Sequence, residues 1–527
     1  MKPYAKSICL LIAIILFSAC GADYASTVLN TDQLLENEHI EPIEKNIPAD
    51  EQTGNIFVPE LTLVDVFAIA NERRQSVKQP DILAAQELLK GYTPGIINVE
   101  DLTGGNLKLS LSREEAIFDA EKYFSMLRHT YGGYTYFGGD EIFLPIFDDI
   151  IEALSKQEEW PTMKFVDEIH SQLSRVIFDN HLFIDMKIYA VEYDFYAWEM
   201  PFDKNGDRFL KRDSGLHVAE IEGYDLDEVF RLAVNEEGEF FYIPIFMEPK
   251  NLSGNLCITV IYDNGDKEIV SLKNPNRRGW PLQDSMLRYK DDIPIVVLRK
   301  MYNPFVGGGL GGNSSNANME DAIRFLSFAE ELKDENVIII DIRSNQGGYS
   351  ILSNKWLYLL TGEIVPNNFL RVHYDLNKLV DLTETLMQQE EDIINNPYYD
   401  LTVESLDQMV PFGEDHFISN PPDRIISNDK LIIFLIDRYV YSAGEVFTDL
   451  INSIENTLVI GQNTAGTLIT GGFITYYLPN SNVAFSITHS FHIFDEAYFR
   501  EGVGIAPDVW VVGDASKAAL AILGSNE

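Results

Sequence analysis

The chain has 527 residues, of which 46% are hydrophobic and 23% are charged. These proportions are ordinary for a globular protein, and the length predicts two to four domains. The formal net charge of -42 would repel nucleic acids and anionic lipid surfaces, so we exclude both as partners.

The first twenty residues have the pattern of a bacterial lipoprotein signal peptide. Lys2 and Lys6 precede an apolar run, Ile8 to Phe17, that is too short to span a bilayer, and small residues then lead to Cys20. We expect a signal peptide over residues 1–20, a lipid on Cys20, and an extracytoplasmic protein anchored to the bacterial cell membrane. An ordinary secretory signal is the alternative, because an aliphatic residue is usual where Phe17 stands.

The three cysteines leave no basis for a disulfide framework. Cys9 lies in the predicted signal peptide and Cys20 would carry the lipid, so Cys257 alone would remain in the mature chain. We therefore expect no internal disulfide and no cysteine-rich metal site.

A tether and a helical subdomain are predicted next. Residues 21–60 are polar, acidic and aperiodic, which is typical of a flexible tether. Residues 61–195 are predicted to form a helical subdomain, because apolar residues recur at helical spacing over 112–132, with further helices over 143–154 and 162–177. A partly alternating, strand-like run over 182–193 follows.

Residues 205–280 are predicted to form a small β-rich module of PDZ type. Strands are expected over 215–224, 240–246 and 256–262, with a short helix over 225–233. Asp263-Asn264-Gly265 is a hairpin signal that leads into a strand over 267–272. Modules of this kind bind the carboxyl ends of peptides by adding a strand to an exposed sheet edge.

From residue 285 to 515 strands alternate with helices, which predicts an α/β core with a parallel sheet. Strands are expected over 293–299, 337–341 and 431–436, and a helix over 319–332. The Gly/Asn/Ser-rich loop over 303–318 is either a connector, which we favour, or a cover over a site.

Ser442 stands where a buried strand passes into a helix. The unbroken apolar run Leu431–Ile436 indicates a strand buried on both faces, and an amphipathic helix follows Glu445. The carboxyl edge of a parallel sheet and the start of a helix often carry the chemistry of α/β proteins. Alternatively, Ser442 and Glu445 form only a capping box, which is far commoner than a nucleophile.

The turn around Gly347 and Gly348 is a second feature of the core. Paired glycines after the strand that ends at Asp341 allow the backbone to approach a ligand and to direct N–H groups into a cleft. A turn that merely needs positive φ is the simpler explanation. Phosphate binding is disfavoured, because no Gly-Lys-Ser/Thr and no G-x-G-x-x-G spacing is present.

Four motifs in order give the core a recognisable character. They are Asp-Ile-Arg-Ser-Asn-Gln-Gly-Gly from Asp341, Tyr-Ser-Ala-Gly-Glu from Tyr441, Val-Ile-Gly-Gln-Asn-Thr-Ala-Gly from Val459, and Gly-Val-Gly-Ile-Ala-Pro-Asp from Gly502. Together they resemble the S41 serine peptidases, which include the carboxyl-terminal processing proteases and the tricorn core proteases. The resemblance implies a crotonase-like α/β fold for the core and a peptide or protein as substrate, with neither metal nor cofactor.

The resemblance also implies roles for single residues. Ser442 corresponds to the nucleophile, and the N–H groups of Gly348 and Ala443 correspond to an oxyanion hole. The processing proteases have a lysine base after their Thr-x-Gly turn, but Thr467 stands there in this chain and cannot accept a proton at neutral pH. A Ser-Lys dyad is therefore not expected.

The tricorn-like branch uses serine, histidine and glutamate. His181 and Glu501 stand at positions that resemble those of its histidine and glutamate. A neutral imidazole suits proton transfer from Ser442, and a carboxylate would orient it. A lone histidine is more often structural, and His489 and His492 are the chief rivals of His181. The sequence thus predicts a lipid-anchored serine endopeptidase.

Two other classes of function stay open. A non-catalytic protein that binds a ligand or peptide could use the same core, and Ser442 would then be a helix cap. An acyl-transfer enzyme of the crotonase fold is disfavoured, because coenzyme A thioesters are chiefly cytoplasmic and the chain begins with a signal segment.

Overall fold

The computed structural model describes residues 61–78, 80–90, 102, 104–250, 255–273, 285–301, 315–374, 408–412, 416–420 and 425–524. The chain divides into two compact units, Met1–Ile56 and Phe57–Glu527, and all described residues belong to the second. The predicted signal peptide, Cys20, the whole tether and most of the Gly-rich loop lie outside the described residues. No helix in the described ranges is both long enough and apolar enough to cross a bilayer.

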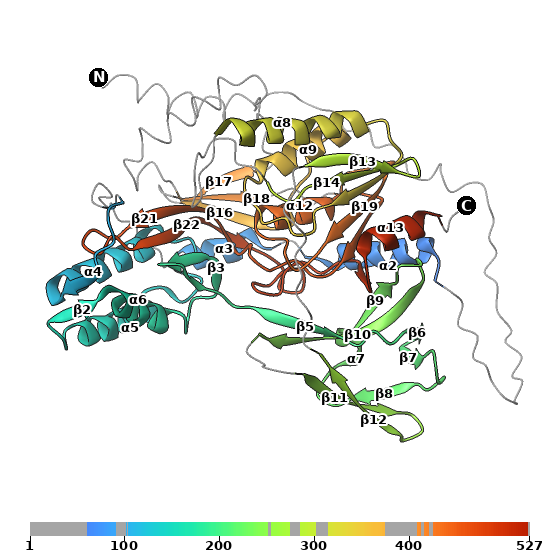
Figure 1. Cartoon of the computed structure of the whole chain (residues 1–527), viewed down its shortest axis with the longest axis horizontal. Helices are drawn as coiled ribbons and strands as arrows, with labels where there is room; N and C mark the ends of the chain where they lie inside the picture. Colours follow the sequence, from blue (N-terminus) through green and yellow to red (C-terminus); the bar gives the residue numbers. More distant parts are fainter. Residues whose placement is uncertain are drawn as a thin grey trace, which may run out of the picture. The chain divides into compact units, whose positions relative to one another are not determined.

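A large mixed sheet forms the centre of the second unit (Figure 1). Its parallel strands run in the order β14, β15, β19, β20, β23, β9. Their bounds are Ile293–Val297, Val337–Asp341, Leu431–Ile436, Thr457–Gly461, Val509–Val511 and Phe230–Val234. Antiparallel strands extend both sides: β13 (Met286–Lys290), and β10 (Phe240–Pro249) with β6 (Phe202–Asn205), β7 (Arg208–Lys211) and β5 (Tyr193–Ala197). The predicted parallel α/β core is confirmed.

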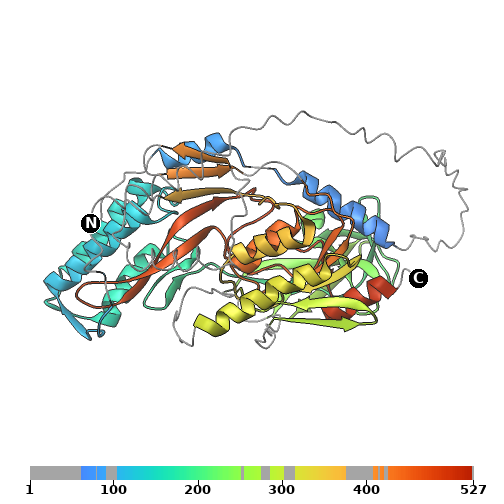
Figure 2. The same cartoon turned by 90° about the horizontal axis from the view of Figure 1, so that it is seen from above.

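Helices cover both faces of the parallel strands. Along β19, Ile432, Phe434 and Ile436 pack into one hydrophobic core, together with residues of α8 (Ser315–Leu332), α9 (Ile351–Thr361) and α12 (Ala443–Ile451). Ile433 and Leu435 point into the opposite core, which includes α2 (Leu63–Ser76) and α13 (Ala515–Gly524). Figures 1 and 2 show these two sets of helices on opposite sides of the sheet. An apolar run without alternation is what burial on both faces requires.

A second, antiparallel sheet carries the histidines that the sequence singled out. Its order is β17, β18, β16, β22, β3, β4, and β21 also pairs with β22. The bounds are Gln408–Phe412, His416–Asn420, Leu370–Tyr374, Ala484–Ile493, Asp179–Ile184, Lys187–Tyr189 and, for β21, Thr470–Tyr477. Helix α3 (Ile82–Leu89) packs beside β16 and β18. His181 lies in β3, whereas His489 and His492 lie in β22.

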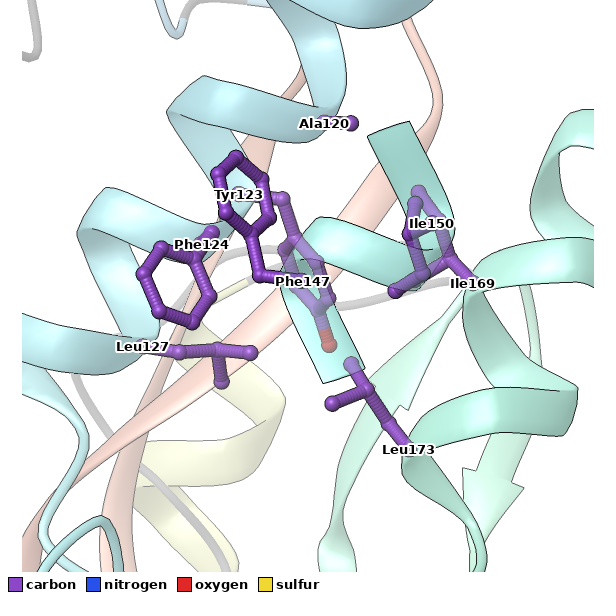
Figure 3. Close-up of a pocket in the computed structure, with 8 residues that line it drawn as sticks. All are labelled: Ala120, Tyr123, Phe124, Leu127, Phe147, Ile150, Ile169 and Leu173. Atoms are coloured by element: carbon purple, nitrogen blue, oxygen red, sulfur yellow. The ribbon is translucent and has the colours of Figure 1, made fainter. Parts of the chain in front are cut away.

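Three helices form the part of the chain between β1 and β3. They are α4 (Arg113–Thr130), α5 (Gly139–Leu154) and α6 (Thr162–Leu173), with the short strands β1 (Ser110–Ser112) and β2 (Glu159–Pro161) beside them. The expected helices are confirmed, and Ser112 and Glu115 form a capping box at the start of α4. Figure 3 shows a small apolar cavity between the three helices, lined by Ala120, Tyr123, Phe124, Leu127, Phe147, Ile150, Ile169 and Leu173.

The segment predicted as a β-rich module contributes strands to two sheets. The three-stranded sheet has the order β12 (Lys267–Leu272), β11 (Leu256–Tyr262), β8 (Val218–Ile221), and Asp263-Asn264-Gly265 forms the expected turn between β11 and β12. The helix expected over 225–233 is wrong in its second half. Only α7 (Leu226–Val229) is helical, because Phe230–Val234 is recruited as β9 beside β23.

Candidate active site

Ser442 occupies the turn between β19 and α12, as the sequence predicted. Its backbone has φ 51° and ψ -115°, a region that side chains with a Cβ rarely adopt and that costs about 1–3 kcal/mol. An ordinary N-cap residue is extended instead. The conformation is held by neighbours, since the N–H of Tyr441 donates to the carbonyl oxygen of Asn345 at 2.9 Å and the N–H of Gly444 donates to that of Tyr441 at 2.9 Å. Strained serine turns of this kind expose a nucleophile.

The side chain of Ser442 meets a histidine that is 261 residues away in the sequence. Ser442 Oγ and His181 Nε2 are 2.9 Å apart, which is within the range for direct proton transfer. Both residues are partly buried. The structure thus brings together the predicted nucleophile and the predicted base.

The environment of His181 favours a neutral imidazole. Burial lowers the pKa of His181 below its ordinary value, and the negative charge of Asp179 acts in the opposite direction. Near neutral pH the ring can therefore accept a proton at Nε2 when the hydroxyl of Ser442 reacts.

Asp179 is a site residue to which sequence reasoning gave no role. It is fully buried, and its carboxylate accepts hydrogen bonds from the N–H of His181 at 2.8 Å, the hydroxyl of Tyr131 at 2.8 Å and the hydroxyl of Thr470 at 2.9 Å. An acidic residue two positions before His181 was the available signal. Its donors come from distant parts of the chain and could not be read from local sequence.

Glu501 reaches the same region through the backbone. Its carboxylate is buried and accepts hydrogen bonds from the N–H groups of Asn180 at 3.0 Å, Leu468 at 3.1 Å and Ile469 at 3.0 Å. Burial raises the pKa of Glu501 well above its ordinary value, and the charge of Asp179 raises it further. The predicted partner of the imidazole therefore contacts the residue immediately before His181.

Glu445 joins the serine turn to the segment that would carry a lysine base. Its fully buried carboxylate accepts hydrogen bonds from the N–H of Ser442 at 3.1 Å, the hydroxyl of Thr464 at 2.6 Å, and the N–H groups of Gly466 at 2.8 Å and Thr467 at 2.7 Å. The N–H of Glu445 donates to the carbonyl oxygen of Ser442 at 2.8 Å. Glu445 therefore does more than cap α12: it fixes the turn at Thr467 against the serine.

The two predicted oxyanion donors lie on adjoining turns. Gly348 has φ 135°, and a Cβ there would stand 1.5 Å from the carbonyl oxygen of Met301, so only glycine fits. A Cβ on Gly347 would stand 2.9 Å from the Cβ of Ser442, which shows how closely the turns approach. Within the described ranges, the N–H groups of Gly348 and Ala443 have no hydrogen-bond acceptor. Both are therefore available to an oxyanion.

Arg438 ties together the turns behind the serine. Its guanidinium donates to the carbonyl oxygens of Thr464, of Val503 at 2.8 Å, of Gly502 at 3.1 Å and of Tyr193 at 3.3 Å. It thereby joins the segment after Glu501 to the turn that Glu445 holds. A charged residue directly after a buried strand was its only sequence signal.

The rival histidines are engaged elsewhere. Nδ1 of His492 donates to the carbonyl oxygen of Leu468 at 2.7 Å. Nε2 of His489 lies 3.3 Å from the hydroxyl of Tyr476, and burial lowers the pKa of His489 to about 4. The histidine in contact with Ser442 is His181. No group of histidine, cysteine and acidic residues suited to a metal ion occurs in the described part of the chain.

The chain matches one family model and is similar to several solved structures. Residues 313–511 match the model of peptidase family S41. Mature CPAF is 13% identical with a TM-score of 0.39 and covers 79% of this chain and 99% of its own. A lipoprotein from Streptococcus agalactiae is 13% identical (TM-score 0.37, 80% and 100% covered), and the photosystem II D1 C-terminal processing protease is 12% identical (TM-score 0.35, 77% and 96% covered).

Scores this low carry neither residue roles nor substrates from those structures to this chain. No curated protein matches the sequence. The match to the family model stands independently of them, and it spans Gly348, Ser442 and Glu501. The chain therefore carries a peptidase family S41 domain within a mixed α/β fold.

Proposed function

We propose that the chain is a serine endopeptidase that cleaves peptides or proteins through an acyl-enzyme. The observation that carries the proposal is the 2.9 Å contact between Ser442 Oγ and His181 Nε2 on a strained strand-to-helix turn. A helix cap explains neither the positive φ of Ser442 nor the histidine. Membership of the S41 domain in a peptidase family supports peptides as the class of substrate.

In the first half of the reaction, Ser442 Oγ attacks the carbonyl carbon of the scissile peptide while its proton passes to His181 Nε2. The oxyanion of the tetrahedral intermediate accepts hydrogen bonds from the N–H groups of Gly348 and Ala443. When the C–N bond breaks, His181 returns the proton to the leaving amine. In the second half, water attacks the carbonyl carbon of the ester on Ser442 while His181 accepts its proton. His181 then returns the proton to Ser442 Oγ as the ester bond breaks.

Glu501 acts on this cycle from behind His181. Its hydrogen bond from the N–H of Asn180 connects it to the strand that bears the histidine, and we assign it the role of orienting that strand and the imidazole. The hydrogen bonds from Leu468 and Ile469 anchor the carboxylate in place.

Fluorophosphonate labelling of the full-length chain in detergent tests the proposal. Wild type should react, and Ser442→Ala and His181→Ala should not. Ser453→Ala is the control: it removes a buried hydroxyl just after the end of α12, and this variant should label like wild type. Equal absence of labelling in folded wild type and Ser442→Ala would contradict the peptidase proposal and favour a non-catalytic binding protein.

The proposal includes a location and a domain organisation. We propose that residues 1–20 are a lipoprotein signal peptide, that Cys20 carries a lipid, and that residues 21–60 tether the remaining segments (61–195 helical, 205–280 PDZ-like, 285–515 crotonase-like) to the outside of a bacterial membrane. Replacing Cys20 by serine should move the chain from the membrane fraction to the soluble fraction. A chain that stays in the membrane would contradict the lipid anchor.

The PDZ-like module is proposed to receive peptide carboxyl ends at β12. This strand is one of the two edge strands of the three-stranded sheet, and Ile269 on it is 77% exposed, as strand addition with a side-chain contact requires. Peptides with free carboxyl termini should bind wild type, and Ile269→Asp should weaken that binding, as measured by fluorescence anisotropy. No binding across a library of such peptides would contradict this assignment.

A further inference from the structure

Asp179 has a buried carboxylate without a cationic partner among the described residues. Its carboxylate is fully buried, and within the described ranges no lysine or arginine forms an ion pair with it. Its hydrogen bonds come instead from neutral donors on three elements: Thr470 of β21, Tyr131 directly after α4, and the N–H of His181 in β3. A buried carboxylate held only by neutral dipoles keeps a strong field around it.

His181 lies within that field. Asp179 lies two residues before it on the same strand and accepts its N–H at 2.8 Å, so the carboxylate fixes the backbone from which the imidazole projects. The same carboxylate opposes the effect of burial on the pKa of His181. Asp179 thus both holds the backbone of His181 and favours the protonated form of its imidazole.

The other acidic groups nearby are arranged differently. Glu501 is bound by three backbone N–H groups and has a pKa raised well above its ordinary value, by burial and then by Asp179. The Glu445 carboxylate faces the turn at Thr464–Thr467. The remaining titratable groups around Asp179 are the tyrosines of α4 and β4, Tyr123 and Tyr189, and Tyr131, whose pKa values burial raises.

We propose that Asp179 is a positioning residue of the Ser442–His181 pair, which holds the backbone of His181 and supplies the negative charge that favours its protonated form during reaction. This inference rests on the proposed function. Asp179 neither gives nor accepts a proton: the proton moves from Ser442 Oγ to His181 Nε2, and the charge of Asp179 stabilises the imidazolium that results. An interaction that strengthens as the imidazolium forms lowers the barrier rather than tightening substrate binding.

The test compares Asp179→Asn with Asp119→Asn in the full-length chain. Asp119 is also a fully buried carboxylate held by neutral donors, from Asn480 and Ser481, but it takes no part in the contacts around Ser442. The rate of fluorophosphonate labelling is measured from pH 5 to pH 9, and its midpoint reports the protonation of His181.

Asp179→Asn should lower the midpoint by about one pH unit, the scale of a neighbouring opposite charge, and reduce the maximal rate at least tenfold. Asp119→Asn should leave the midpoint unchanged whatever it does to stability. A folded Asp179→Asn chain with the wild-type midpoint would overturn the inference, whereas a wild type that never labels would overturn the proposed function itself.

If Asp179→Asn does not fold, Asp179→Glu decides the matter. It keeps the charge and displaces it by one methylene, so the midpoint should stay near that of wild type while the maximal rate falls. A Glu variant with the wild-type rate would overturn the positioning role.

Discussion

Gly348 and Ser442 show how much of this site depends on backbone conformations that few residues accept. Gly348 has φ 135° beside the carbonyl oxygen of Met301, and Ser442 has φ 51° beside Gly347. Each turn restricts the other, because a side chain on either glycine would push the serine turn or Met301 away. The proposed oxyanion donors are therefore positioned by packing between turns rather than by either turn alone.

Gly348→Ala should abolish most labelling by the fluorophosphonate. The added methyl would stand 1.5 Å from the carbonyl oxygen of Met301, so the turn must move and carry its N–H away. Loss of one oxyanion donor typically costs on the order of 10²–10³ in rate. Gly206→Ala is the matched control, since Gly206 also has positive φ (63°) but open space around it. It should lose about 1 kcal/mol of stability and label normally. Wild-type labelling of Gly348→Ala would refute its role.

Asp449 predicts a pH dependence of stability that is separate from catalysis. It lies on α12, and burial raises its pKa from 3.8 to about 6, although Asn368 and Tyr498 donate hydrogen bonds to it. Between these values the folded chain holds a proton that the unfolded chain has released. The free energy of unfolding therefore falls as pH rises from about 4 to about 6, by roughly 3 kcal/mol.

Asp449→Asn removes this titration. In urea unfolding, the difference in stability between the variant and wild type should shift in favour of the variant by roughly 3 kcal/mol between pH 4 and pH 7. Asp148→Asn, at an exposed position on α5, is the control for a lost surface charge. A difference that is the same at both pH values would show that Asp449 does not hold the proton.

The residues of the site differ in how far sequence could identify them. Ser442 and His181 were predicted from motifs and family resemblance, and the absence of a lysine at Thr467 led to the expectation that they meet, as the 2.9 Å contact shows. Asp179 and Arg438 were missed, because their importance lies in partners such as Thr470 and Gly502 that are distant in sequence. Local sequence patterns do not reveal hydrogen-bond partners that the fold brings close from distant segments, and the roles of Asp179 and Arg438 depend on such partners.

Among elements, the strands of the core were the most predictable. The bounds of β15 and β19 agree with the expected Val337–Asp341 and Leu431–Ile436, because strands buried on both faces need continuous apolar runs. β9 was the opposite case. The sequence pattern of this segment predicted a helix, but the segment pairs in parallel with β23, which lies near the other end of the chain. Local sequence contains no signal for so distant a partner.

Helix α2 holds the segment after Glu501 in place. Arg73 and Arg74 both pair with Asp508, whose side chain is fully buried, and Arg74 also donates to Thr457. The N–H of Lys78 donates to Asp495 at 2.9 Å. Residues of α2, and Lys78 just after it, thus contact the chain both before Glu501, at Asp495, and after it, at Asp508.

Arg74→Ala should destabilise the chain by roughly 3–5 kcal/mol, because it removes a buried partner from the buried carboxylate of Asp508. The expected result is a lower midpoint in thermal or urea unfolding. Lys156→Ala, which breaks the exposed pair with Glu152 on α5, should leave the midpoint unchanged. Equal behaviour of the two variants would argue that Arg73 alone satisfies Asp508.

At the scale of the whole molecule, the net charge of -42 should affect the stability of the fold. Like charges repel across a compact chain more than across an unfolded one, and salt shortens the range of that repulsion to about 8 Å at 0.15 M. The melting temperature should therefore rise by several degrees when NaCl increases from 10 to 200 mM. Tetramethylammonium chloride at equal ionic strength should have the same effect, since screening does not depend on the cation. A melting temperature that stays constant or falls would contradict this.

The order of the site along the chain has a consequence for biosynthesis. His181 emerges from the ribosome long before Ser442, and Glu501 follows later still. The serine turn also needs the Thr464–Thr467 segment to hold Glu445. A nascent chain therefore has no complete site until Glu501 has been made, so the proposed nucleophile should become reactive only after that point. Ribosome-stalled chains that end before Glu501 should not label, whereas released full-length chains should. Synthesis of the segment that carries Glu501 would then serve as the activating event.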